Sequence, residues 1–201
     1  MKAGIFGGTF DPIHLGHLII AEEARCRFKL DKIIFVPAGQ PWMKADRTIT
    51  SGEHRLAMLR ISTASNPYFE ISSVELERTG PTYTVDTLEQ LWKELGYTSQ
   101  LYLLLGWDSL KDLPKWKAPL RISRMATLVA FPRPGYEKPD VTKLESEVPG
   151  LTEKLVMQDG PYIGISSTCI RQKIADGHSI RYKVPEAVAQ YITDHRLYES
   201  S

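Results

Sequence analysis

Apolar runs and amphipathic stretches alternate along this chain. The apolar runs predict buried strands at Lys2–Phe6, Lys32–Val36, Gln100–Leu105, Thr127–Phe131 and Lys154–Met157, with a looser strand pattern over Tyr68–Arg78. The stretches between them carry apolar residues at spacings of three or four, which is typical of helices. Strands that alternate with helices pair in parallel through right-handed crossovers. The pattern therefore predicts an α/β protein: one Rossmann-like domain over residues 1–201, whose mostly parallel sheet is flanked by helices.

Several helices have recognisable ends. The first begins at about Leu15, a second follows a capping box of Thr50 and Glu53, a third has Thr84 as its N-cap and Gly96 as its end, a fourth is capped by Ser166 or Ser167 and runs to Gly177, and the last starts at Pro185. We interpret the last helix as packing. The stretch from Tyr136 to Glu153 reads as a surface helix or loop without chemistry.

The first seventeen residues combine a strand, a glycine turn and a helix. Gly7 and Gly8 break the strand and allow the backbone to approach a ligand closely. The helix that follows directs N–H groups and a positive dipole end toward the same point, which suits a phosphate. His14 and His17 share one face at the start of this helix. Their imidazoles can stabilise negative charge that develops on phosphoryl oxygens.

Further candidate residues follow the other predicted strands. Because ligands bind at the carboxyl edge of a parallel sheet, we expect these residues to meet in one cleft. They are Lys44 in the loop from Pro37 to Thr48, the helix start at Thr82–Thr87, Asp108 and Trp116 after the central strand, Arg133 after the next strand, and Ile165–Arg171. Arg55 could pair with a carboxylate or orient the loop, and we favour a structural role for it.

Composition narrows the class of protein. The chain has 201 residues, 42% of them hydrophobic and 24% charged, and its formal net charge is +1, which gives no case for a nucleic-acid or membrane partner. No apolar run is long enough to cross a membrane, and no signal peptide is evident, so we expect a cytoplasmic protein. Cys26 and Cys169 read as reduced thiols, although a disulfide stays open.

Two segments carry a family resemblance. Gly7–His17, GGTFDPIHLGH, resembles the first signature of the (H/T)xGH nucleotidyltransferase superfamily, with His14-Leu15-Gly16-His17 as the motif itself. Ile165–Arg171, ISSTCIR, resembles the second signature, which holds the β- and γ-phosphates of ATP. The resemblance extends from Met1 to about Tyr198 and implies a Rossmann-like nucleotidyltransferase fold.

The middle of the chain resembles one branch of that superfamily, the bacterial nicotinate-nucleotide adenylyltransferases. The matching patterns are Thr-Tyr-Thr-x-x-Thr at Thr82–Thr87, Gly-x-Asp at Gly106–Asp108 and Leu-x-x-Trp at Leu113–Trp116. Two positions depart from the branch. Pro41-Trp42-Met43-Lys44 stands where Pro-Pro-His-Lys is usual, and Trp107 occupies a position that is commonly small, where it could crowd or reshape the pocket.

The resemblance implies a reaction and its participants. The adenylyl group of ATP passes to nicotinate mononucleotide, giving nicotinate adenine dinucleotide and pyrophosphate in NAD biosynthesis, by direct in-line attack without a covalent enzyme intermediate. Mg²⁺ is expected with ATP, held largely by phosphates and water. The expected partners are these small molecules, with no nucleic acid and no membrane, and a homo-oligomer stays open.

The resemblance also assigns roles to residues. Catalytic stabilisation of the phosphates falls to His14, His17, Lys44 and Arg171. ATP is expected to bind at Gly7, Gly8, Thr9, Phe10, His14, Gly16, His17, Ile165, Ser166, Ser167, Thr168 and Arg171. Nicotinate mononucleotide is expected to bind at Lys44, Thr82, Tyr83, Thr84, Gly106, Asp108, Trp116 and Arg133.

Two other functions stay open at this point. A pantetheine-phosphate adenylyltransferase would share the first and last signatures, but its chains are usually shorter and lack the patterns at Thr82–Thr87 and Leu113–Trp116. A regulatory module could keep the nucleotide-binding fold without turnover. Degraded histidines or a lost Lys44 would favour that module, and neither is seen in this sequence.

Overall fold

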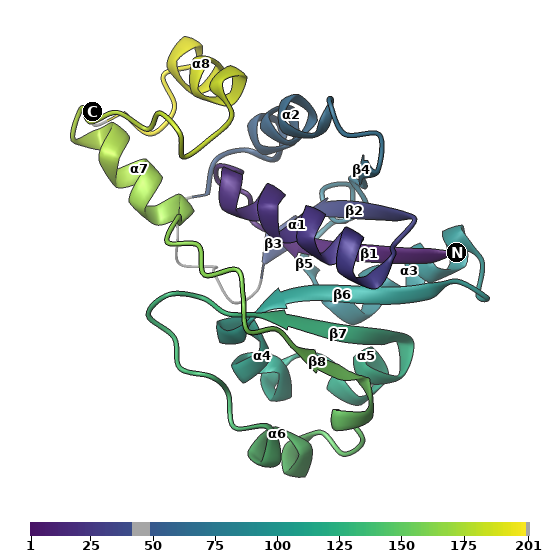
Figure 1. Ribbon diagram of the computed structural model, residues 1–201. Coiled ribbons are helices and arrows are strands. Elements are labelled where there is room, and N and C mark those ends of the chain that lie inside the picture. Colours follow the sequence, from purple (N-terminus) through teal and green to yellow (C-terminus); the bar gives the residue numbers. More distant parts are fainter. Residues whose placement is uncertain (42–48, 200–201) are drawn as a thin grey trace.

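Six parallel strands form the centre of the molecule in the computed structural model (Figure 1), which describes residues 1–41 and 49–199. Their order is β4-β2-β1-β6-β7-β8, and every neighbouring pair is parallel. The strands are β1 (Lys2–Gly8), β2 (Lys32–Pro37), β4 (Phe69–Ile71), β6 (Gln100–Gly106), β7 (Ala126–Phe131) and β8 (Leu155–Met157). The predicted α/β fold with a parallel sheet is confirmed.

Helices cover both faces of this sheet because successive side chains of the central strands point to opposite sides. One core cluster contains Ile5, Leu103 and Leu128. Its helices are α3 (Thr84–Leu95), α4 (Trp107–Asp112), α5 (Pro119–Met125) and α6 (Val141–Glu147). The other cluster contains the next residue along each of those strands, Phe6, Leu104 and Val129. Its helices are α1 (Leu15–Phe28), α2 (Gly52–Thr63), α7 (Ser167–Ala175) and α8 (Glu186–Asp194).

The strand order places a topological switch point beside β1. The chain runs outward from β1 through β2 to β4, and then returns to β6 on the other side of β1. Ligands bind outside the carboxyl ends of the strands at such a point. A second, two-stranded sheet pairs β3 (Gln40–Pro41) with β5 (Pro81–Thr82), so the residues after β2 lie next to those that lead into α3.

The structure corrects the predicted starts of two helices. The capping box of Thr50 and Glu53 is wrong by one position, because Ser51 is the N-cap of α2 and its hydroxyl accepts from the His54 N–H. The N-cap of α3 is Tyr83, and Thr84 is its first helical residue. Adjacent residues that can each occupy the cap position make such shifts hard to foresee.

The strand predicted over Tyr68–Arg78 is much shorter in the structure. Only Phe69–Ile71 pairs with β2. The Ser72 N–H still donates to the Phe35 carbonyl, but the chain then turns, with the N–H groups of Leu76 and Glu77 both donating to Ser73. In contrast, the ends of α3 at Gly96 and of β8 at Met157 match the predictions.

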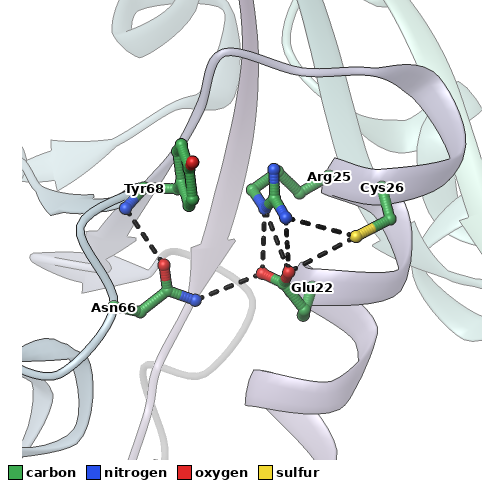
Figure 2. A network of polar contacts seen from close by, with 5 residues as sticks. All are labelled: Glu22, Arg25, Cys26, Asn66 and Tyr68. Atoms are coloured by element: carbon green, nitrogen blue, oxygen red, sulfur yellow. Dashed lines mark hydrogen bonds and ion pairs between the residues drawn. The ribbon is translucent and has the colours of Figure 1, made fainter.

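A polar network joins the far end of α1 to the segment before β4 (Figure 2). The Glu22 carboxylate accepts from Arg25 at 2.6 Å, from the Asn66 amide at 3.2 Å and from the Cys26 thiol at 3.3 Å. The Arg25 guanidinium lies 4.2 Å from the centre of the Tyr68 ring. The hydrogen bond from Arg25 lowers the pKa of Glu22 to about 2, and the bond to Glu22 raises the pKa of Cys26.

Two expectations about chemistry outside the site can be compared with the structure. Cys26 and Cys169 are both exposed free cysteines, as the prediction of reduced thiols requires. Within residues 1–41 and 49–199, no helix is long and apolar enough to span a membrane.

Candidate active site

Two glycines at the end of β1 open the site. The prediction that they break the strand is wrong, because Gly7 and Gly8 still pair with Val36 and Pro37 of β2, and the chain turns only after them. A Cβ on Gly8 would lie 2.9 Å from the ring of Phe10, so the strand end packs only with glycine there. A Cβ on Gly7 would meet nothing within 4 Å, which leaves open space beside the backbone. The Phe10 ring itself is 2% exposed and packs against Phe6 and Phe35. The Phe10 ring is therefore part of the core, which leaves only its main chain for the ATP contact expected there.

The two motif histidines stack on each other at the start of α1. Their ring centroids are 3.6 Å apart and the ring planes differ by 21°. A Cβ on Gly16 would lie 3.0 Å from Nδ1 of His14 and 3.1 Å from Ile163. The glycine between the histidines is thus what allows this close stacking.

Hydrogen bonding fixes the proton on His17. Its Nδ1 accepts the backbone N–H of His14 at 3.2 Å, so the neutral ring carries its proton on Nε2. His14 is 6% exposed, and burial, followed by the charge of Arg133, lowers its pKa to about 4. Near neutral pH His14 is therefore an uncharged imidazole, able to donate or accept a hydrogen bond but carrying no net charge.

Arg55 holds three loops of the site together. This side chain is 2% exposed and donates to the carbonyl oxygens of Thr9 at 2.9 Å, Ala38 at 2.8 Å and Thr50 at 2.9 Å. Burial lowers the pKa of its guanidinium. The interpretation of Arg55 as a structural residue that orients a loop is confirmed.

The second signature lies directly against the first. Ser166 is the N-cap of α7, and its hydroxyl accepts from the Cys169 N–H at 3.2 Å. The Ser167 hydroxyl donates to the carbonyl of Pro12 at 2.9 Å. Arg171 donates from Nη1 to the carbonyl of Asp11 at 2.7 Å. Ile165 precedes these residues in the sequence, and Thr168 lies among them. The two signatures, which are far apart in the chain, thus form one surface.

The start of α3 forms the other side of the site. The hydrogen bonds of this helix begin with Asp86 and Thr87, which both donate to the Tyr83 carbonyl, so the N–H groups of Thr84 and Val85 have no intrahelical acceptor. Lys117 lies beside this helix start, with Nζ 4.6 Å from the Tyr83 ring centre and 2.9 Å from the Asp86 carboxylate. N–H groups without an intrahelical acceptor and a nearby ammonium suit a carboxylate ligand.

Asp108 and two tryptophans follow β6. Asp108 forms an ion pair with Arg133, and its Oδ1 is buried without a hydrogen-bond partner in the described part of the chain. The same holds for Nε1 of Trp116, which is half-buried against the core. Trp107 is 5% exposed and packs in the core, with its ring edge-on to Tyr162. Trp107 is thus part of the core and leaves little surface for a ligand.

The predicted residues therefore meet at one edge of the sheet, with one exception outside the described residues. Lys44 belongs to residues 42–48, for which the structure gives no placement. The ends of β3 and α2 on either side of that segment lie at the same edge, since β3 pairs with β5 and Thr50 bonds to Arg55. The contacts of all these residues with ligands stay predictions.

Sequence reasoning missed two residues of the site. The carboxylate of Asp11, which is 4% exposed, accepts the hydroxyl of Tyr198 at 2.7 Å and the N–H of Thr50 at 3.3 Å. Asp11 stands inside the first signature, and its place there was a usable signal. Tyr198 lies 187 positions later, in a stretch interpreted only as packing, and nothing local marks it.

Comparison with protein families gives a match over most of the chain. The cytidylyltransferase-like family model matches residues 5–173. A probable nicotinate-nucleotide adenylyltransferase of Dehalococcoides mccartyi is 48% identical over 98% of this chain and 97% of its own length. A relative of the same name from Roseiflexus sp. is 48% identical over 97% of this chain and 96% of its own length.

Solved structures share the fold at lower identity. The Plasmodium falciparum nicotinic acid mononucleotide adenylyltransferase complexed with NaAD is 21% identical, covers 98% of this chain and 97% of its own, and has a TM-score of 0.78. A putative nicotinate-nucleotide adenylyltransferase from Vibrio parahaemolyticus is 17% identical, covers 100% of this chain and 96% of its own, and has a TM-score of 0.72. These likenesses support the Rossmann-like architecture.

Proposed function

This chain belongs to the cytidylyltransferase-like family, in its nicotinate-nucleotide adenylyltransferase branch, and on that premise we propose that it transfers the adenylyl group of ATP to nicotinate mononucleotide. The products are nicotinate adenine dinucleotide and pyrophosphate, and the reaction serves NAD biosynthesis. One observation carries the proposal: Ser167 and Arg171 bind the main chain of the first signature, so both nucleotide-binding signatures form a single site.

ATP is proposed to bind between these two signatures. The backbone at Gly7, Gly8 and Thr9 and the N-terminus of α1 would face the phosphates nearest the adenosine. The N-terminus of α7 and the guanidinium of Arg171 would hold the β- and γ-phosphates. Arg171 has five N–H donors, so the bond to the Asp11 carbonyl leaves others for pyrophosphate.

Nicotinate mononucleotide is proposed to bind at the start of α3. Thr82, Tyr83 and Thr84 would receive the nicotinate carboxylate at the first N–H groups of the helix, which have no intrahelical acceptor. Trp116 would stack on the pyridine ring. Gly106, Asp108 and Arg133 would line the ribose and phosphate, where Asp108 already has one oxygen without a partner among the described residues.

Catalysis is then proposed to consist of positioning and charge stabilisation. An oxygen of the mononucleotide phosphate forms a bond to the α-phosphorus of ATP, while the bond from that phosphorus to the α–β bridging oxygen breaks. The electron pair leaves with pyrophosphate, and no covalent enzyme intermediate forms. His17 would donate its Nε2–H to an oxygen of the reacting phosphate, since its Nδ1 is occupied by the His14 N–H. Lys44 is proposed to assist from the segment that follows β3.

Magnesium is proposed to enter with ATP. Within residues 1–41 and 49–199, no group of three or more His, Cys, Asp or Glu side chains could hold a metal ion. The site carboxylates Asp11 and Asp108 are engaged by Tyr198 and Arg133. Phosphate oxygens and water would therefore supply the ligands of the ion, which offsets charge on the triphosphate.

The function is tested by pyrophosphate release from ATP and Mg²⁺ with nicotinate mononucleotide, nicotinamide mononucleotide or phosphopantetheine as acceptor. We expect the highest kcat/KM with nicotinate mononucleotide. A preference for phosphopantetheine would replace the proposal with a pantetheine-phosphate adenylyltransferase. Binding of ATP without turnover of any acceptor would point to a regulatory module.

A further inference from the structure

The carboxylate of Asp11 is buried inside the first signature with two donors. Asp11 is 4% exposed, and it lies between the glycine turn and His14. Its Oδ1 accepts the hydroxyl of Tyr198 at 2.7 Å, and its Oδ2 accepts the N–H of Thr50 at 3.3 Å. Each oxygen of this buried carboxylate thus has a neutral partner.

A guanidinium also bonds to Asp11, but at its main-chain oxygen and not at its carboxylate. Arg171 donates from Nη1 to the main-chain oxygen of Asp11 at 2.7 Å. A guanidinium that bonds to the main chain of a buried aspartate would normally pair with its carboxylate, because charge-assisted bidentate bonds are among the strongest in proteins. In this structure the hydroxyl of Tyr198 and the N–H of Thr50 bond to the two carboxylate oxygens instead.

Tyr198 is well suited to remain a donor. Its side chain is partly buried, and burial, followed by the charge of Asp11, raises the pKa of its hydroxyl. It therefore stays protonated over the range in which enzymes of metabolism work. The ring also packs against the core cluster beneath α8, so the hydroxyl is held in place by the C-terminal segment.

We propose that Tyr198 is a positioning residue for ATP: its hydroxyl satisfies Asp11 and so keeps the guanidinium of Arg171 directed at the leaving pyrophosphate. This inference rests on the proposed function. Without the hydroxyl, the buried carboxylate lacks one donor. The charge of Arg55 also acts on Asp11, but its guanidinium is held by three main-chain carbonyls. Arg171 is held by the Asp11 carbonyl and would rotate from it to the carboxylate, away from the phosphates.

Tyr198→Phe tests this role because it removes only the hydroxyl. We expect KM for ATP, and the dissociation constant of ATP measured by calorimetry, to rise about tenfold, as for a weakened charge-assisted phosphate contact. KM for nicotinate mononucleotide is expected to stay within about twofold, because the effect passes through Arg171 alone. Unchanged ATP constants, or equal losses for both substrates, would overturn the proposal.

A second substitution separates positioning from packing. In the Tyr198→Phe background, Asp11→Asn removes the charge that draws Arg171 away, and we expect the affinity for ATP to recover most of its loss. If the double variant binds ATP no better than Tyr198→Phe, the hydroxyl acts only through packing. Recovery would have no explanation in a purely structural role.

Tyr191→Phe provides the matched control. Its hydroxyl bonds to Nδ1 of His54 at 2.9 Å and so also ties α8 to the body of the molecule, but it does not touch Asp11. We expect this variant to keep the ATP constants of the parent protein, and its melting temperature calibrates the loss of one such bond. If the parent protein binds ATP but does not use nicotinate mononucleotide, the proposed function fails, while the calorimetric comparison still decides the role of Tyr198.

Discussion

The two histidines of the HLGH motif differ in what their ring nitrogens can do. His17 has Nδ1 committed to the backbone of His14 and presents Nε2–H. His14 is buried and stays uncharged near neutral pH. The two imidazoles of the motif are therefore not equivalent. His17 is an oriented hydrogen-bond donor, and His14 is a neutral ring stacked on it.

His17→Ala is expected to lower kcat at least about a hundredfold, the scale of losing one preorganised donor to a developing charge. Steady-state pyrophosphate release measures this loss. His17→Asn, whose amide can still donate, is expected to retain more activity than the alanine variant. A near-normal kcat in folded His17→Ala protein would remove His17 from the mechanism.

His14 makes the stability of the protein depend on pH. Its pKa is about 4 in the folded state against an ordinary value of 6.5, so between these values the unfolded chain binds a proton that the folded chain does not. The free energy of unfolding should therefore decrease as pH falls from 6.5 toward 4, by at most about 3 kcal/mol, and level off below. Urea denaturation at several pH values measures it.

His14→Gln is the control for this pH effect. The variant lacks the titrating ring. The difference in free energy of unfolding between the parent protein and the variant should therefore shrink as the pH falls from 6.5 toward 4. The pKa of Glu22 is lowered to about 2, so its contribution to the free energy of unfolding is lost only as the pH falls below its ordinary pKa of 4.5. Above pH 4.5, the pH dependence therefore reports on His14 and not on Glu22. A difference that is independent of pH would contradict the assignment to His14.

At the level of individual residues, the sequence predicted the HLGH motif but not the contact between Asp11 and Tyr198. Gly7, Gly8, His14 and His17 stand together in one local pattern that only a strand, turn and helix can satisfy. Asp11 and Tyr198 meet only after the whole chain has folded, and no local spacing records that contact. Contacts across so long a separation are set by tertiary packing, which a single sequence does not display.

At the scale of elements, α1 is anchored at both ends by polar contacts. Its N-terminus carries the histidines, and its last turns carry the network of Glu22, Arg25 and Cys26 that reaches Asn66 (Figure 2). The network orients the helix from the end opposite the site. It also changes the chemistry of the exposed thiol.

Glu22→Gln is expected to make Cys26 react faster with a thiol reagent. The Glu22 carboxylate holds the thiol hydrogen and raises the pKa of Cys26, whereas a neutral amide leaves Arg25 to favour the thiolate. In a Cys169→Ser background, we expect the rate at pH 8 to rise about threefold or more. Glu23→Gln, on the same helix, is the control and should change the rate far less.

Which elements were predictable follows from their burial. Central strands such as Gln100–Gly106 are covered on both faces and read as continuous apolar runs. The edge strand β4 has only three paired residues, and the β-branched Val74 after it lies in a turn, so the predicted strand was too long. Helix α5 is seven residues long and was not predicted, because so short a stretch offers little periodicity.

At the scale of the whole molecule, the sheet separates the helices that we propose for the two substrates. The proposed ATP-binding elements α1 and α7 pack with Phe6 and Leu104 on one face. The elements proposed for nicotinate mononucleotide, α3 and α4, pack with Ile5 and Leu103 on the other. The carboxyl ends of β1 and β6, which lie side by side, are where the two substrates would meet.

Leu104→Ala is expected to lower the free energy of unfolding by about 2–5 kcal/mol, since Leu104 is buried in the central strand and truncation leaves a cavity. Urea denaturation of the ligand-free protein measures the loss. Ile19→Ala is the control: Ile19 is 43% exposed on α1, and its truncation should change the free energy by no more than about 0.5 kcal/mol. Equal losses would mean that the sheet is not the stabilising centre.

The bond between Asp11 and Tyr198 has a consequence during synthesis of the chain. These residues are 187 positions apart, so at about 5–20 residues per second the first signature is synthesised roughly 10–40 s before its last supporting residue. A chain that ends before Tyr198 would carry the two glycines and both histidines without the hydroxyl proposed to hold Arg171 in place. If Tyr198 has the proposed role, ATP binding at full affinity requires the chain to be synthesised almost to its end.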